Sequence, residues 1–196
     1  MERNYPPLKR AVRADVIRYN GRYSRKALIK LVLTRRTFRP IYSLRLCQHF
    51  SQSRNPLARI FHYWTTHNAS IDFPWRIQLG EGFYINHGWG MVISPRSVIG
   101  RNVTLFHGVT LGQKDDITAE GRTTSYPTLE DDVWVGPHVV IIGGVTVGEG
   151  SRLGGGAVIA KDVEPHTIVV GGGQRVVQEN ATPDVENRVP VEEFAD

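Results

Sequence analysis

Cysteine and long apolar runs are what this 196-residue sequence has least of. Its one cysteine, Cys47, has no partner for an intramolecular disulfide, which favours a reducing cytoplasm. No uninterrupted apolar run approaches the roughly 20 residues of a membrane-spanning helix, and the opening residues lack the apolar core of a signal peptide. We therefore expect a cytoplasmic protein that is neither exported nor inserted in a membrane.

Acidic residues are scarce in the first seventy positions, which hold three lysines and twelve arginines against Glu2 and Asp15. The remainder has the opposite balance, with nine basic and seventeen acidic residues. The length leaves room for one main domain and a smaller appendage. The charge asymmetry predicts that residues 1–70 form a separate basic segment with a role of its own.

Helical spacing of apolar residues within this basic segment predicts short helices over 11–19 and 24–35, with further helices starting near Pro40 and Pro56. We expect their apolar stripes to pack against one another or against the rest of the protein. The alternative is a basic amphipathic surface on the inner face of an anionic membrane, where each nearby Lys or Arg adds about 1 kcal/mol. No nucleic-acid motif accompanies the arginines, so no nucleic-acid partner is expected.

An aliphatic residue at every sixth position is the dominant pattern of the second part. The column consists of Ile99, Leu105, Leu111, Leu129, Val135, Ile141, Val147, Leu153 and Ile159, and five of these nine are followed directly by glycine. The fifth place of each six is valine, serine or alanine, and only Asp115 breaks that second column. A short fixed period predicts a solenoid, in which each unit buries its apolar face only by stacking on its neighbours.

This repeat resembles that of the hexapeptide-repeat acyltransferases, whose triangular prism takes three sixes per turn. The resemblance implies a left-handed parallel β-helix, an exception to the usual right-handed crossover. We expect a mainly β fold, with this helix over 71–175, a small α-helical segment over 1–70 and an acidic tail over 176–196. A polar loop excursion over 113–128 interrupts the repeat.

His87 is the candidate catalytic residue, because the small residues around it leave its ring accessible. His107 follows twenty positions later, which is one turn of eighteen plus a slip of two near Met91, so the two rings are predicted to stack on one face. Asp72 precedes His87 by fifteen positions. Imidazole titrates near working pH and can take a proton from a hydroxyl, and a carboxylate on its other nitrogen can orient it.

The run from Ile71 to Pro74 looks like the segment before the catalytic histidine of serine acetyltransferases, where an aspartate pairs with that histidine. The resemblance extends to Arg175, and it implies an acetyl-CoA-dependent O-acetyltransferase with no metal, in which Asp72 orients His87. The Gly-rich and basic C-terminal part is similar to the coenzyme A end of that family. The implied coenzyme A contacts are Gly112, Gly136, Gly154, Gly155, Lys161 and Arg175.

The acceptor side departs from that family. Serine acetyltransferases normally have an aspartate just before the catalytic histidine and an Arg-His-Pro in the excursion, whereas this chain has Asn86 and Ser125-Tyr126-Pro127. The run 106–110 and the short basic segment look more like the colanic acid acetyltransferase branch. We therefore predict transfer to a sugar hydroxyl of an exopolysaccharide, capsule or related glycan, with serine O-acetylation in cysteine biosynthesis as the alternative. The predicted acceptor residues are Asn86, Trp89, His107 and Tyr126.

The resemblance further implies a homotrimer with active sites between adjacent prisms.

Two other functions compete with the predicted acetyltransferase activity. A zinc carbonic anhydrase on this fold needs three metal histidines, two of them close in sequence, whereas the spacings from His87 onward are 20, 31 and 28 residues. A non-catalytic scaffold would need neither the Asp72 and His87 pair nor a coenzyme A end, so an enzyme is predicted.

Overall fold

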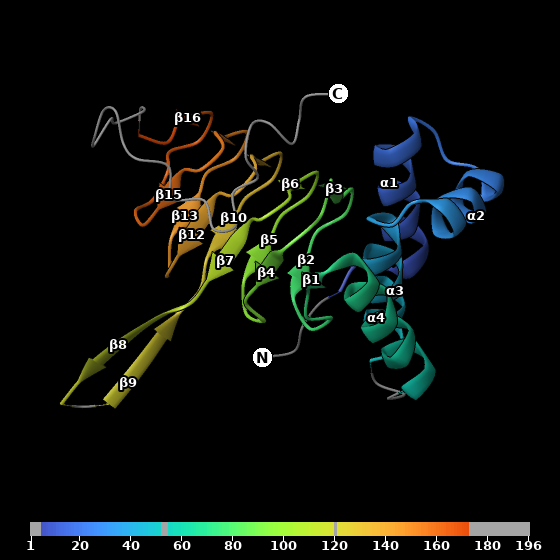
Figure 1. Cartoon of the computed structure of the whole chain (residues 1–196), viewed down its shortest axis with the longest axis horizontal. Helices are drawn as coiled ribbons and strands as arrows, with labels where there is room; N and C mark the ends of the chain where they lie inside the picture. The colour runs from blue at the N-terminus through green and yellow to red at the C-terminus, as the bar shows by residue number, and fades with distance from the viewer. Residues whose placement is uncertain (1–4, 52–54, 120, 173–196) are drawn as a thin grey trace, which may run out of the picture.

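The computed structural model of the chain describes residues 5–51, 55–119 and 121–172 (Figure 1). Within these ranges four helices come first and cluster at one end of a stack of short strands. The helices are α1 (Leu8–Asn20), α2 (Arg25–Thr34), α3 (Phe38–His49) and α4 (Pro56–Ala69). Helices occur where the sequence predicts them, and α3 begins two residues before Pro40 because proline is tolerated in a first helical turn.

The strands after the helices form three parallel sheets, one for each face of a three-sided helix. Sheet A contains β1 (Ile71–Asp72), β4 (Met91–Ile93), β7 (Thr110–Gly112), β12 (Val140–Ile142) and β15 (Val158–Ile159). Sheet B contains β2 (Gln78–Leu79), β5 (Val98–Ile99), β10 (Thr128–Leu129) and β13 (Thr146–Val147). Sheet C contains β3 (Tyr84–Asn86), β6 (Thr104–Phe106), β11 (Trp134–Val135), β14 (Arg152–Leu153) and β16 (Ile168–Val169).

The six-residue period sets the register of these sheets. Leu105 pairs with Val135, and Val135 pairs in turn with Leu153, so the column residues lie directly above one another. Every aliphatic of the first column is at most 4% exposed, and the fifth-place valines from Val103 to Val139 are fully buried. Both columns therefore face the interior, and the predicted left-handed parallel β-helix is confirmed.

Two corners of the prism matter for function. The C–A corner follows the sheet C strands and comprises segments 87–90, 107–109, 136–139 and 154–157. The A–B corner follows the sheet A strands and comprises segments 94–97, 113–127, 143–145 and 160–162. The excursion predicted as a loop leaves the A–B corner as an antiparallel hairpin of β8 (Lys114–Thr118) and β9 (Gly121–Ser125), which projects away from the prism (Figure 1).

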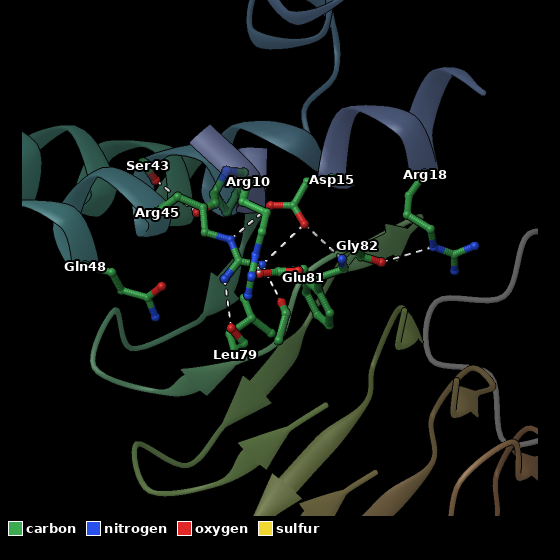
Figure 2. A network of polar contacts seen from close by, with 12 residues as sticks. Arg10, Asp15, Arg18, Ser43, Arg45, Gln48, Leu79, Glu81 and Gly82 are labelled. Atoms are coloured by element: carbon green, nitrogen blue, oxygen red, sulfur yellow. Dashed lines mark hydrogen bonds and ion pairs between the residues drawn. The ribbon is translucent and has the colours of Figure 1, made fainter. Parts of the chain in front are cut away.

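The helical segment covers the first turn of the prism, where the lowest strands have no strand below them. Ile41 and Leu44 of α3 belong to the same apolar cluster as the prism interior. Polar side chains from the helices meet the backbone groups of this first turn (Figure 2). Arg45, for example, donates to the carbonyl oxygen of Leu79 at 2.8 Å and pairs with Asp15, whose carboxylate accepts the N–H of Phe83 at 2.9 Å.

Three more side chains complete this polar covering of the first turn. The hydroxyl of Tyr19 donates to the carbonyl of Ile85 at 3.1 Å and accepts its N–H at 3.0 Å, and burial raises the pKa of Tyr19. His62 and Gln48 reach the carbonyls of the segment that leads into β2. Exposed strand edges invite pairing with other chains, and this arrangement blocks that edge. Packing of the apolar residues of α1, α2 and α3 is thus confirmed. The prediction is wrong for the apolar stripe of α4, where Leu57, Ile60 and Trp64 are more than half exposed.

Candidate active site

The turn after β3 presents His87. The backbone of His87 lies in the left-handed region, with φ of 63°, which costs a residue with a Cβ about 1–2 kcal/mol. Gly88 follows, and a side chain there would come within 2.5 Å of Ile85 and 3.2 Å of Ile71. The close approach of these neighbours fixes the turn, and it leaves the His87 ring exposed at the C–A corner.

Three histidine rings gather at this corner. The His87 and His107 ring centroids are 6.1 Å apart, with the rings edge to face. This confirms the prediction that the two residues lie one above the other in adjacent turns. The ring of His138 lies 4.9 Å beyond His107 and perpendicular to it. His138 was not predicted, because 31 residues separate it from His107 and the register places it opposite Gly108. Its ring occupies the space that a Gly108 side chain would fill.

The middle ring of this trio has an unsatisfied nitrogen. The Nδ1 atom of His107 is buried and has no hydrogen-bond partner within the described residues. Aromatic rings border the three histidines: the ring centroid of Phe106 lies 6.4 Å from that of His87 and 4.8 Å from that of Trp134. The corner thus combines a polar strip of imidazoles with an aromatic wall.

A cavity of about 330 Å³ opens beside His87. It is lined by Tyr19, Thr34, Arg35, Arg36, Thr37, Tyr84, Ile85, Asn86 and His87. Asn86 and His87 therefore line one cavity. Sequence patterns missed the contribution of the segment between α2 and α3, because nothing in residues 34–37 indicates which strand they meet.

Asp72 and Trp89 lie near this turn in other surroundings. Asp72 is exposed on β1 and lines a different cavity, and no described hydrogen bond or ion pair joins it to His87. Its predicted pairing with His87 stays a prediction. Trp89 is 56% exposed, and its ring lies beneath the guanidinium of Arg36, 3.7 Å from the guanidinium carbon to the ring centroid.

The remaining predicted residues divide between the two corners. Gly136, Gly154 and Gly155 lie at or next to the C–A corner, while Gly112, Tyr126 and Lys161 lie at or next to the A–B corner. Within one chain the structure therefore does not bring Tyr126 to the histidines; its ring instead faces Arg96 at 5.7 Å. Arg175 lies outside the described residues, as does the tail over 176–196.

The predicted coenzyme A glycines differ in whether packing within the chain leaves room for a side chain. A Cβ on Gly136 would come within 2.8 Å of the Leu153 carbonyl oxygen in the next turn, so packing explains this glycine. A Cβ on Gly112 would have only ordinary contacts, the nearest 3.7 Å away on Ile142. Packing within one chain therefore does not require glycine at 112.

The surroundings of Cys47 disfavour nucleophilic catalysis by its thiol. Burial raises the pKa of the Cys47 thiol to about 11, and this thiol donates to the Ala58 carbonyl, so it is a poor nucleophile. Residues 5–51, 55–119 and 121–172 contain no group of three or more side chains that could hold a metal ion. In the same ranges, each helix is too short or too polar to cross a membrane.

Comparisons with known proteins agree with this architecture. Residues 126–161 match the family described as bacterial transferase hexapeptide, six repeats, so the fold and its repeats define a hexapeptide transferase. The serine acetyltransferase of Bacillus pumilus is 35% identical over 156 residues, which cover 79% of this chain and 70% of that protein. The serine acetyltransferase of Bacillus subtilis is 38% identical over 124 residues, which cover 63% of this chain and 55% of that protein.

A solved structure extends the likeness. Soybean serine acetyltransferase complexed with serine superposes with a TM-score of 0.70 at 30% identity, over 87% of this chain and 69% of that one. The chain belongs to the serine acetyltransferase family. It is an acetyl-CoA-dependent O-acetyltransferase, as its sequence predicts.

Proposed function

We propose that the acceptor is the hydroxyl of L-serine and that His87 is the general base. The observation that carries this proposal is the similarity to serine acetyltransferases over most of the chain, together with a solved relative that holds serine. The comparisons fit this alternative better than the sugar acceptor predicted above. In particular, the relatives from Bacillus pumilus, Bacillus subtilis and soybean are all serine acetyltransferases.

The chemistry follows from an exposed imidazole beside a cavity. His87 takes the proton of the acceptor hydroxyl as the oxygen attacks the thioester carbonyl carbon. The tetrahedral intermediate collapses with cleavage of the carbon–sulfur bond, and the imidazolium returns the proton to the leaving sulfur. Asp72 orients His87 in this proposal, as the family resemblance implies, once the two side chains meet.

A homotrimer brings the two corners together. In the proposed assembly, the histidines at the C–A corner of one prism face the A–B corner of its neighbour, with Tyr126, Gly112 and Lys161. This arrangement accounts for the division of predicted residues between two corners of a single chain. Acetyl-CoA would lie between the prisms, along Gly154 and Gly155 on one side and Lys161 on the other.

One observation keeps a sugar hydroxyl in the test. Asn86 and the Ser125-Tyr126 pair replace the carboxylate and the basic residues that the serine acetyltransferase pattern has at these places. A neutral amide and hydroxyls suit an uncharged acceptor better than an ammonium and a carboxylate.

The test is acetyl-CoA consumption, read as free thiol, with L-serine in one reaction and sugars, nucleotide sugars and oligosaccharides in others. We expect release with L-serine, and mass spectrometry should find O-acetylserine. D-serine is the matched control, because it has the same groups in the wrong arrangement. Release with a sugar and none with L-serine would overturn the proposed acceptor and leave the acetyltransferase assignment intact.

A further inference from the structure

Arg36 contacts the turn that presents His87 and lines the same cavity as this histidine. Its guanidinium donates to three carbonyl oxygens: those of Ala69 at 2.8 Å, His87 at 2.9 Å and Gly88 at 3.1 Å. It also lies over the ring of Trp89 at 3.7 Å. One side chain from the α2–α3 connection therefore binds most of the His87–Trp89 turn.

The bond from Arg36 to the Ala69 carbonyl connects the His87 turn with a second segment of the chain. Ala69 is the last residue of α4, and the chain then passes through Ser70 into β1, which carries Asp72. The carbonyl of Ser70 also accepts the N–H of Gly90 at 2.8 Å. Arg36 thus joins the segment leading to Asp72 with the turn that holds His87.

The geometry points to Arg36 as a positioning residue for His87, one that holds the left-handed turn in the conformation that the reaction needs. This inference rests on the proposed role of His87 as general base. A guanidinium suits the task because its planar N–H groups meet several carbonyls at once, whereas a lysine ammonium is a compact charge on a flexible stem. The turn needs such support because φ of 63° is unfavourable for histidine.

The chain offers a matched control in Arg18. This arginine also joins the helical segment to the prism, with contacts to the Gly82 carbonyl at 3.0 Å and the Thr104 hydroxyl at 2.7 Å. Gly82 precedes β3 and Thr104 is the first residue of β6, whereas the His87 turn follows the other end of β3. Loss of Arg18 removes comparable bonds without touching residues 87–89.

The test compares Arg36→Ala, Arg36→Lys and Arg18→Ala in the full chain. We expect Arg36→Ala to lower kcat about 10- to 100-fold at nearly unchanged KM for acetyl-CoA, because a small displacement of a catalytic group costs this much. Arg36→Lys should recover little of the loss, and guanidinium ions at low millimolar concentration should recover part of it in Arg36→Ala. Arg18→Ala should keep kcat within about twofold while it lowers the thermal midpoint.

An acceptor-free measurement separates this inference from the proposed acceptor. The imidazole resonance of His87, assigned by its loss in His87→Ala, is recorded by NMR at one pH without substrates. We expect its chemical shift to change in Arg36→Ala and to stay unchanged in Arg18→Ala. Identical His87 shifts in the original protein and both variants, with kcat of Arg36→Ala within twofold of the original, would overturn the positioning role even if serine is acetylated. Conversely, a failure of serine turnover leaves the NMR comparison valid.

Discussion

Asp15 and Arg45 form an ion pair in which both side chains are 1% exposed, between α1 and α3 at the base of the prism (Figure 2). Each partner also binds the first turn, since Asp15 accepts the N–H of Phe83 and Arg45 donates to the carbonyl of Leu79. The pair therefore joins three parts of the molecule: two helices and the lowest turn of strands. Its loss leaves a buried charge and unsatisfied backbone groups.

Asp15→Asn is expected to destabilise the protein by about 3–5 kcal/mol, because removal of one partner leaves the Arg45 charge uncompensated in the interior. Urea unfolding followed by circular dichroism measures this change. Asp116→Asn is the control, because its ion pair with Lys114 is exposed on the hairpin and is expected to contribute little. Equal midpoints for the two variants would show that the buried pair does not stabilise the fold.

The His62 side chain predicts a pH dependence of stability. His62 is buried between α3 and the prism, with Nε2 2.7 Å from the Phe73 carbonyl and Nδ1 2.9 Å from the Ser43 hydroxyl. Burial lowers the pKa of His62, so the unfolded chain binds a proton more readily than the folded one. Stability should therefore fall as the pH drops below about 6.5, by up to about 1.4 kcal/mol per pH unit, and be unaffected by this group above it.

Urea unfolding of the original protein and of His62→Gln between pH 5 and pH 8, a range set by the ordinary histidine pKa of about 6.5, isolates this contribution. Glutamine can still meet the Phe73 carbonyl, but it does not titrate. We expect the difference in free energy of unfolding between the two proteins to shrink toward acid. A difference that is constant across the range would mean that His62 is protonated equally in the folded and unfolded chains.

The repeat was predictable because the polarity of each residue in it indicates whether that position is buried or exposed. Column residues such as Leu105 and Val135 alternate with polar ones at a fixed period, and stacking of identical units leaves no other place for them. The helical part of the structure was different. Asp15 lies on the buried stripe of α1 with Ala11 and Val12, which is a usable signal, but nothing in the sequence says which arginine it meets.

The active site was predictable only in part, for a related reason. The turn arithmetic that stacks His107 on His87 fails for His138, whose ring reaches the others because Gly108 leaves space. Arg36 is one of twelve arginines in the basic segment, and its contact with the His87 turn depends on how the helices sit on the prism. Tyr126 and His87 were predicted to share one site, but they lie on two different corners of the chain, and the sequence does not show how corners of neighbouring chains would meet.

Catalysis by His87 can be tested against a histidine of the same backbone conformation. His166 also lies in a left-handed turn, with φ of 57°, at the corner between sheets B and C. His87→Ala should lower kcat about 100- to 10,000-fold, the usual contribution of a general base, while acetyl-CoA affinity measured by calorimetry stays nearly unchanged. His166→Ala should keep full activity; equal activity of the two variants would contradict the role of His87.

Alanine substitutions of two glycines at the C–A corner distinguish the cost of backbone strain from the cost of a clash with the histidines. Gly108 and Gly156 have φ of 68° and 72°, so an alanine at either place costs about 1–2 kcal/mol of backbone strain. At Gly156 a Cβ meets nothing within 4 Å, whereas at Gly108 it would overlap the ring of His138. Gly108→Ala should therefore destabilise the protein more than Gly156→Ala, by a further 1–3 kcal/mol or so for overpacking, and it should also shift the NMR resonances of the His138 and His107 rings. Equal unfolding free energies with unmoved histidine resonances in Gly108→Ala would contradict the tight contact between this glycine and the histidine trio.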